Sequence, residues 1–286
     1  MDYREVRRVV ITAMFVDDVL FEKLVLKGGN ALDIVYRVGS RTSLDVDLSI
    51  EGDFGDVDDA KRRLFNALED RFDSAGYVVF DLRFCRRPPL PRADRPDWGG
   101  YVIEFKIIEK ERFGPLSANR DALGRNATLV APGQKRVFRV ELSKNEYCKG
   151  KIEAEVDAHK IFVYSLPMIV VEKLRAVCQQ MNEYALRCPK TARARDFLDI
   201  YSVLIRGDID LTSAENQELV REMFAVKSVP LLLLGKIGEY REFHRADWDA
   251  VIVAAGVQLK EYDFYFDYVL NKVKELESLW VVQSPR

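Results

Sequence analysis

The chain has few of the residues that most often hold zinc, with only two histidines and four cysteines among its 286 residues. No two of the cysteines form a C-x-x-C pair, so no zinc pattern is present; they are Cys85, Cys148, Cys178 and Cys188. The most apolar late run, 229–234, is far too short to cross a bilayer. The first ten residues are charged, unlike a signal peptide. We therefore expect reduced thiols in a cytoplasmic protein that has no membrane partner.

The chain also lacks a large excess of either charge, because 44 Lys and Arg and 46 Asp and Glu leave a formal net charge of −2. This balance excludes a molecule that attracts polyanions over its whole surface, although local basic patches remain possible. Two short clusters are candidates for contact with an RNA backbone: Lys61, Arg62 and Arg63, and Arg86, Arg87, Arg92 and Arg95. Charge runs are more often simply solvated surface.

The most informative segment begins K-G-G-N-A-L at Lys27 and continues to R-T-S-L-D-V-D at 41–47. Apolar and polar residues alternate over 44–50, which predicts a strand with Asp45 and Asp47 on one face. Two neighbouring carboxylates repel each other and favour a cation. Mg²⁺ takes one or two carboxylates together with phosphate oxygens. The pair therefore indicates a site for Mg²⁺, or Mn²⁺, and a nucleoside triphosphate (NTP).

The glycine pair supplies the matching phosphate site. Without Cβ atoms, Gly28 and Gly29 let backbone N–H groups approach a phosphate, and the following helix would point its positive end at that anion. Lys27, Arg41 and Ser43 join the candidate nucleotide-binding residues. The segment fits neither the P-loop nor the Rossmann glycine pattern. Either half of the motif alone is also typical of an ordinary turn or a polar strand, so the combination carries the interpretation.

A second constellation lies in the later part of the chain, where Lys173 stands in an otherwise apolar run. Asp196 and Asp199 are one helical turn apart and share a face. A lysine near apolar surface is costly unless it is paired or used. Two interpretations are open: a structural ion pair between Lys173 and Asp196, or a lysine that binds triphosphate oxygens and is oriented by Asp196.

The secondary-structure pattern changes near residue 165. Residues 1–164 mix strands and helices, whereas 165–286 read as helical, which predicts an α+β fold with a mixed-sheet domain followed by a helical bundle. We expect single helices over 4–20 and 262–280, and a helix over 58–75 ended by Gly76. The aromatic stripe of the last helix predicts core packing rather than base stacking; it comprises Tyr262, Phe264, Tyr265, Phe266 and Tyr268.

Four blocks in this order, K-G-G-N-A-L, R-T-S-L-D-V-D-L, V-V-E-K-L-R-A and R-A-R-D-F-L-D-I-Y, resemble the AbiEii/AbiGii toxins of the DNA-polymerase-beta-like nucleotidyltransferase superfamily. The resemblance implies an NTP held in a cleft between the two domains, and an antitoxin partner. Some members of this family add nucleotides to the 3′ acceptor end of tRNA, so the resemblance implies tRNA as an expected acceptor. By position it assigns phosphate contacts to Gly28, Gly29 and Ser43, and metal contacts to Asp45 and Asp47. It assigns Lys173 as the motif lysine and Asp196 as the acid that follows it.

The superfamily often adds a third carboxylate from a neighbouring strand. Glu141 is the candidate for this third metal ligand, and Glu104 is the runner-up; either is also consistent with an exposed strand acid. The predicted reaction is transfer of a nucleoside monophosphate (NMP) from an NTP to a hydroxyl, with an RNA 3′-OH as the expected acceptor and with release of pyrophosphate. Three alternatives stay open: a protein or small-molecule acceptor, a regulatory module without turnover, and a kinase-like phosphoryl transferase.

Overall fold

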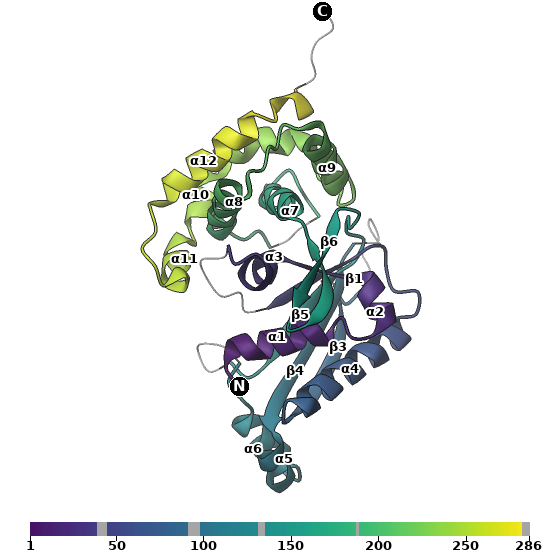
Figure 1. Cartoon of the computed structure of the whole chain (residues 1–286). Coiled ribbons are helices and arrows are strands. Elements are labelled where there is room, and N and C mark those ends of the chain that lie inside the picture. Colours follow the sequence, from purple (N-terminus) through teal and green to yellow (C-terminus); the bar gives the residue numbers. More distant parts are fainter. Residues whose placement is uncertain (39–44, 91–97, 131–134, 187–188, 282–286) are drawn as a thin grey trace, which may run out of the picture. The chain divides into compact units, whose positions relative to one another are not determined.

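The chain forms two compact units, seen in a computed structural model that describes residues 1–38, 45–90, 98–130, 135–186 and 189–281. The first unit consists of Met1–Val35 and Ser43–Val163, and the second of Tyr36–Thr42 and Tyr164–Arg286. Strands and helices are combined in the first unit, and the described part of the second unit is helical (Figure 1). The α+β class predicted from the sequence is confirmed.

The first unit is built on a seven-stranded mixed sheet in the order β3-β4-β5-β2-β1-β7-β6. The central strand β2 runs parallel to β5 and antiparallel to β1, while β1 runs parallel to β7. The strands are β1 (Leu24–Lys27), β2 (Val46–Ile50), β3 (Tyr77–Arg87), β4 (Gly100–Glu109), β5 (Phe138–Ser143), β6 (Lys151–Val156) and β7 (His159–Tyr164). The sheet order places β1, β2 and β5, which lie far apart in the sequence, side by side.

Helices α1 (Tyr3–Ala13) and α4 (Val57–Ser74) lie together on one face of this sheet (Figure 1). Alternation sends Phe138, Val140 and Leu142 of β5 to that face, and all three are buried. Phe72 of α4 packs edge-on against Phe105, which in turn packs against Phe138. The opposite face of the same strands is therefore the one that carries polar side chains.

Two local predictions in this unit need correction. The single helix predicted over 4–20 is wrong, because Asp17 accepts hydrogen bonds from two backbone N–H groups and starts a separate helix, α2 (Asp18–Lys23). The four prolines between 86 and 100 predict a loop over these residues, but β3 continues to Arg87, so the strand ends later than this pattern indicates. The helix before Gly76 ends as predicted, with Gly76 at φ +84°. Two short helices, α5 (Lys110–Leu116) and α6 (Arg120–Asn126), follow β4.

The second unit is organised around α7 (Leu166–Cys178), which lies between α8 (Ala194–Gly207) and α9 (Ala214–Ala225) (Figure 1). A 3-10 segment (Leu231–Tyr240), α10 (Arg241–Arg245), α11 (Trp248–Ala255), α12 (Tyr262–Lys274) and a final 3-10 turn (Glu277–Leu279) complete it. The single helix predicted over 262–280 is therefore too long.

The aromatic stripe of α12 packs inward, as predicted, for Tyr262, Tyr265 and Phe266, which are buried beside Phe197 and Trp248 of neighbouring helices. Among the helices of the described residues, none has the length and apolar character needed to span a membrane.

Candidate functional site

The glycine turn of the motif lies directly against the strand aspartate. Gly28 begins a short helical turn, α3 (Gly28–Asn30), that continues as a π-helical turn over Ala31–Val35. Its φ of +67° favours glycine, and a Cβ built there would lie 3.0 Å from Oδ2 of Asp47. Both the backbone conformation and the close approach therefore require a glycine at this position. Gly29 lies in the same turn.

Asp47 is the middle member of a row that crosses three strands. In the sheet register it lies opposite Lys27 of β1 on one side and Glu141 of β5 on the other. Registered residues of neighbouring strands point to the same face, so these three side chains share the polar face of the sheet. Asp45 stands just before β2 begins and is exposed. The two aspartates of the motif therefore flank the first residue of the strand.

The two candidates for the third carboxylate occupy different places. Glu141 lies beside Asp47, whereas Glu104 lies one strand further out on β4, opposite Arg139. Arg139 donates a 2.6 Å hydrogen bond to Glu104 and lies 3.7 Å from the Glu141 carboxylate. That bond to Glu104, with the charges of Glu104, Glu141 and Asp45, raises the pKa of Arg139. The geometry therefore favours Glu141 over Glu104 as a partner for Asp47.

Lys27 is buried in a small polar cluster on the same face. Its Nζ lies 3.5 Å from the Glu146 carboxylate and donates a 3.3 Å hydrogen bond to Oγ of Ser143. A buried cation of this kind needs such partners. Two predicted nucleotide-binding residues, Arg41 and Ser43, lie outside the described residues.

A buried hydrogen-bonded chain that the sequence analysis missed holds the aspartate segment. Asn30 donates a 2.5 Å hydrogen bond from Nδ2 to the backbone carbonyl of Asp45. Its Oδ1 accepts a 2.8 Å bond from Arg7 of α1, and Arg7 also pairs with Asp33 at 2.9 Å. The guanidinium of Arg7 lies 5.2 Å from the centre of the Tyr3 ring. A signal was present in the sequence, since Arg7 falls on the apolar face of its helix, one turn before Val10 and Ile11.

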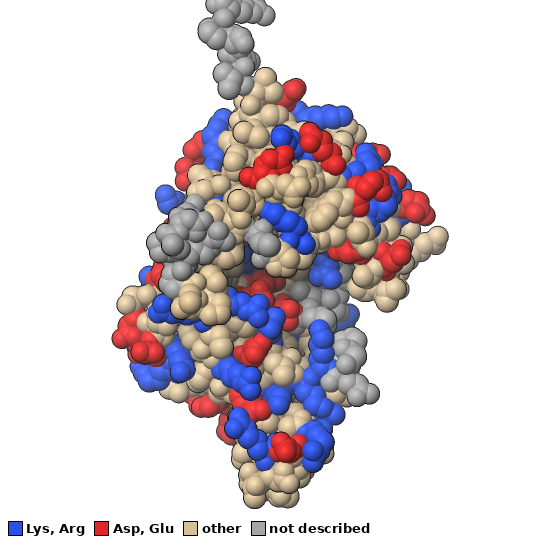
Figure 2. Space-filling model, turned by 180° about the vertical axis from the view of Figure 1, so that it is seen from behind, with Lys and Arg blue, Asp and Glu red and all other residues tan. Residues whose placement is uncertain are grey.

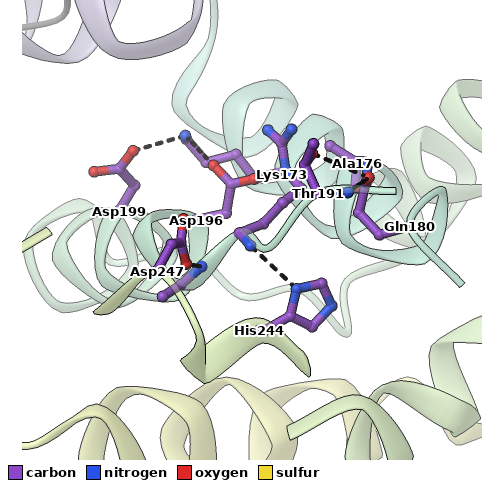
Figure 3. Close-up of polar contacts among 10 residues, drawn as sticks. Lys173, Ala176, Gln180, Thr191, Asp196, Asp199, His244 and Asp247 are labelled. Carbon is purple, nitrogen blue, oxygen red and sulfur yellow. Dashed lines mark hydrogen bonds and ion pairs between the residues drawn. The ribbon is translucent and has the colours of Figure 1, made fainter. Parts of the chain in front are cut away.

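In the second unit, Lys173 of α7 meets two carboxylates of α8 (Figure 3). Its Nζ lies 2.9 Å from Asp196 and 2.7 Å from Asp199, and all three side chains are buried. Burial alone would raise the pKa of Asp196, but the charges of Arg193 and Lys173 hold that pKa well below its ordinary value. The sequence analysis paired Lys173 with Asp196 only, and the structure adds Asp199 as a second partner.

The start of α8 is held by two further side chains from α10 and the turn after it (Figure 3). His244, which is fully buried, accepts a 3.2 Å hydrogen bond at Nδ1 from the backbone N–H of Arg193. Asp247 accepts a 2.9 Å bond from the N–H of Ala194. Burial lowers the pKa of His244 to about 4, so its ring is neutral and can accept this bond.

The donor set of the first unit suits a hard divalent ion. Asp45, Asp47 and Glu141 offer carboxylate oxygens only, which are the ligands that Mg²⁺ prefers. Within the described residues, no three His, Cys, Asp or Glu side chains are already grouped closely enough to hold a metal ion. A pair of carboxylates completed by substrate phosphates is the usual arrangement for Mg²⁺, so the residues present fit this ion.

A mixed sheet with a glycine turn against a strand carboxylate is consistent with a nucleotidyltransferase. The chain belongs to the family described as nucleotidyl transferase AbiEii toxin of type IV toxin–antitoxin systems, whose model matches residues 10–268. The protein is thus a nucleotidyltransferase toxin, and membership implies an NTP substrate and an antitoxin. Enzymes of this class generally use a divalent metal. The resemblance stated from the sequence motifs is confirmed.

Comparison with solved structures finds likenesses of low identity. The MenT4 nucleotidyltransferase toxin of Mycobacterium tuberculosis is 14% identical with a TM-score of 0.48, covering 96% of this chain and 82% of its own. The JHP933 protein of Helicobacter pylori is 14% identical with a TM-score of 0.46, covering 96% and 90%. An antigenic nucleotidyltransferase-like protein of Paracoccidioides brasiliensis is 15% identical with a TM-score of 0.38, covering 79% and 89%. No curated protein matches significantly.

Proposed function

We propose that this toxin transfers an NMP from an NTP to the 3′-hydroxyl of an RNA, the acceptor end of tRNA being the expected target. The main observation in support of this site is the position of Asp47, which lies between the Gly28 turn and Glu141. The backbone of the Gly28 turn and the carboxylate of Asp47 thus lie close together. A phosphate chain bound at the turn would then lie beside the carboxylate oxygens.

In this proposal Gly28 and Gly29 contact the triphosphate through their backbone, as their missing side chains allow. Asp45 and Asp47, with Glu141, would hold Mg²⁺ or Mn²⁺. When bound, such an ion neutralises phosphate charge and stabilises the oxygens of a displacement at phosphorus. Asn30 fixes the backbone at Asp45, and Lys27 lies next to Asp47 in the register. These residues supply positioning and electrostatic stabilisation, which dominate phosphoryl-group chemistry.

The transfer is a single displacement. The oxygen of the acceptor hydroxyl forms a bond to the α-phosphorus, and its proton passes to solvent. The bond from the α-phosphorus to the bridging oxygen breaks, and pyrophosphate leaves with that electron pair. We further propose that the 165–286 domain contributes Lys173 and Asp196 to NTP binding. Because Lys173 is already paired with two carboxylates, this role requires that it exchange one partner for a phosphate.

The test is incubation of the protein with each α-labelled NTP, Mg²⁺ and total RNA, with Asp47→Asn and Gly28→Ala alongside. We expect label in small RNA from wild type only. Asp47→Asn removes a carboxylate charge, and Gly28→Ala brings a methyl group to 3.0 Å from Asp47. Asp70→Asn is the matched control, because Asp70 is an exposed aspartate of α4, which covers the other face of the sheet.

Full transfer by a folded Asp47→Asn protein would contradict the proposed site. Label in protein or in a small molecule instead of RNA would overturn the proposed acceptor and leave the site standing. Binding of NTP without release of pyrophosphate, in the presence of RNA and Mg²⁺, would favour the regulatory module. Release of a nucleoside diphosphate would indicate a kinase-like reaction.

A further inference from the structure

The second half of β3 carries an unusual set of exposed cations. Arg83, Arg86 and Arg87 are exposed, and Cys85 between them is exposed as well. β3 forms one edge of the sheet. Residues 83–87 pair with β4 without irregularity, because the bulge of this hairpin lies before Arg83. The positions of their side chains therefore follow from simple alternation.

The register places part of this set on the face that carries the candidate site. Asp47 pairs with Glu141, Glu141 with Val102, and Val102 with Cys85, so one row crosses four strands. Three strand spacings of about 4.8 Å put Cys85 roughly 14 Å from Asp47. Arg83 and Arg87, two residues on either side of Cys85, point to the same face. Arg86 points to the opposite one.

The charge balance distinguishes these two arginines from the other cations nearby. Lys106 and Arg120 both pair with Asp81, and Arg139 pairs with Glu104. Arg83 lies opposite Glu104 in the register, but Arg139 already binds that carboxylate. Within the part of the chain that the structure describes, neither Arg83 nor Arg87 forms an ion pair with a carboxylate. Acidic and basic side chains are otherwise interspersed over the visible surface (Figure 2). Two unneutralised guanidinium groups about 14 Å apart along an edge strand suit a repeating anion rather than a single one.

We propose that Arg83 and Arg87 form a ledge that binds the phosphate backbone of the acceptor RNA just upstream of its 3′ end. The inference rests on the proposed function, because it takes the reacting 3′-hydroxyl to lie at Asp47. From there the RNA strand runs across β5 and β4 to the edge of the sheet. The contacts are with phosphates, so the ledge positions RNA of any sequence. Arg92 and Arg95 of the same predicted cluster lie outside the described residues.

The first experiment measures binding of a short single-stranded RNA, labelled at its 5′ end, by fluorescence anisotropy over a range of salt concentrations. The variant is Arg83→Gln/Arg87→Gln. Each phosphate contact makes the slope of log K against log salt more negative by about 0.7. The slope of the double variant should therefore be less steep than that of wild type by about 1.4. The same relation gives roughly fivefold per contact, or about 25-fold together, in affinity at 0.1 M salt. In transfer assays the KM for RNA should rise, while the KM for NTP and kcat at saturating RNA stay unchanged.

The matched control is Lys61→Gln/Arg62→Gln, which removes the same number of positive charges from α4. Lys61 and Arg62 belong to the other predicted cluster and are exposed, but Arg62 pairs with Asp59. We expect the control to keep the wild-type salt slope. An equal loss in both variants would indicate a general charge effect and overturn the ledge, as would an unchanged slope in the Arg83→Gln/Arg87→Gln protein.

Cys85 offers a second readout that needs no variant. Its thiol is exposed, whereas Cys148 and Cys178 are buried. RNA should slow alkylation of Cys85 by iodoacetamide, followed by peptide mapping, and inorganic phosphate at the same charge concentration should not. An unchanged alkylation rate with RNA bound would contradict the ledge. Since both readouts follow binding alone, they separate failure of the ledge from failure of RNA as the acceptor, which the labelling assay reports.

Discussion

The hydrogen bond from Asn30 to the Asp45 carbonyl can be removed almost without changing shape. Arginine only donates and a carbonyl only accepts, so the contacts fix the orientation of the amide between Arg7 and Asp45. Asn30→Asp keeps an acceptor for Arg7 but replaces the donor facing Asp45 with an oxygen. Two acceptor oxygens at 2.5 Å repel each other, so the segment that carries Asp45 must move.

The expected cost in folding is modest. One hydrogen bond is lost while the bond from Arg7 gains an ionic partner, so we expect the free energy of unfolding to fall by about 1–2 kcal/mol. In a chain of this size that lowers Tm by roughly 2–8 °C. The cost in catalysis should be larger, because a displacement of about 1 Å at a reacting centre can reduce the rate about 100-fold. Asn30→Asp should therefore lower kcat roughly 10- to 100-fold.

The assay combines kcat and KM for the NTP with a thermal melt. Asn126→Asp is the matched control: Asn126 also accepts from an arginine, Arg112, and donates to a backbone carbonyl, that of Ala122, but it lies on α6. We expect this control to keep wild-type kcat. If Asn30→Asp is folded and keeps the wild-type kcat, the reasoning that Asn30 positions Asp45 is wrong.

Two further predictions concern the second unit. Lys173→Met removes the ammonium group that both buried carboxylates share, although Asp196 keeps its ion pair with Arg193, so the free energy of unfolding in urea should fall by about 3–5 kcal/mol. Unchanged stability with transfer lost would instead assign the lysine to NTP binding alone. Burial lowers the pKa of His244 from 6.5 to about 4, so between these pH values the unfolded state binds more protons than the folded state. The neutral ring therefore makes its full contribution to stability above pH 6.5, and this contribution falls as the pH drops toward 4. Between pH 7 and 5 this amounts to about 2 kcal/mol; His244→Gln, which keeps an acceptor for Arg193, should remove that part of the pH dependence, and an unaltered pH profile would refute it.

Local patterns in the sequence were sufficient for the fold class. The helix that ends at Gly76 and the strand with alternating residues after Asp45 need only neighbouring positions to be recognised. The predicted helix over 4–20 failed because Asp17 caps a new helix inside a continuous apolar period. The helix over 262–280 was drawn too long for a related reason, since apolar spacing continues through the 3-10 turn after α12. Periodicity identifies buried faces better than it identifies ends.

The candidate site depends on pairing that the sequence does not specify. Alternation predicts that Asp47 points to a polar face, but only the register shows that Glu141, far along the chain, lies beside it. Glu104 lies in an equally good alternating strand. What separates the two is their distance across the sheet from β2 and the hydrogen bond of Glu104 to Arg139. Long-range contacts of this kind follow from the whole fold.

Family membership has a similar limit. The family match begins at residue 10, so it does not include Arg7 or Tyr3, and motif resemblance assigns no role to either. Yet Arg7 is fully buried and joins Asn30 and Asp33, within the segment that follows the glycine turn. Burial raises the pKa of Tyr3, the charge of Arg7 lowers it, and the negative charge of Asp45 raises it further. The Tyr3 hydroxyl therefore lies near enough to Asp45 to interact with its charge. The motif residues thus depend on the part of α1 that precedes the matched segment, because the buried guanidinium of Arg7 holds the Asn30 amide that binds the Asp45 carbonyl.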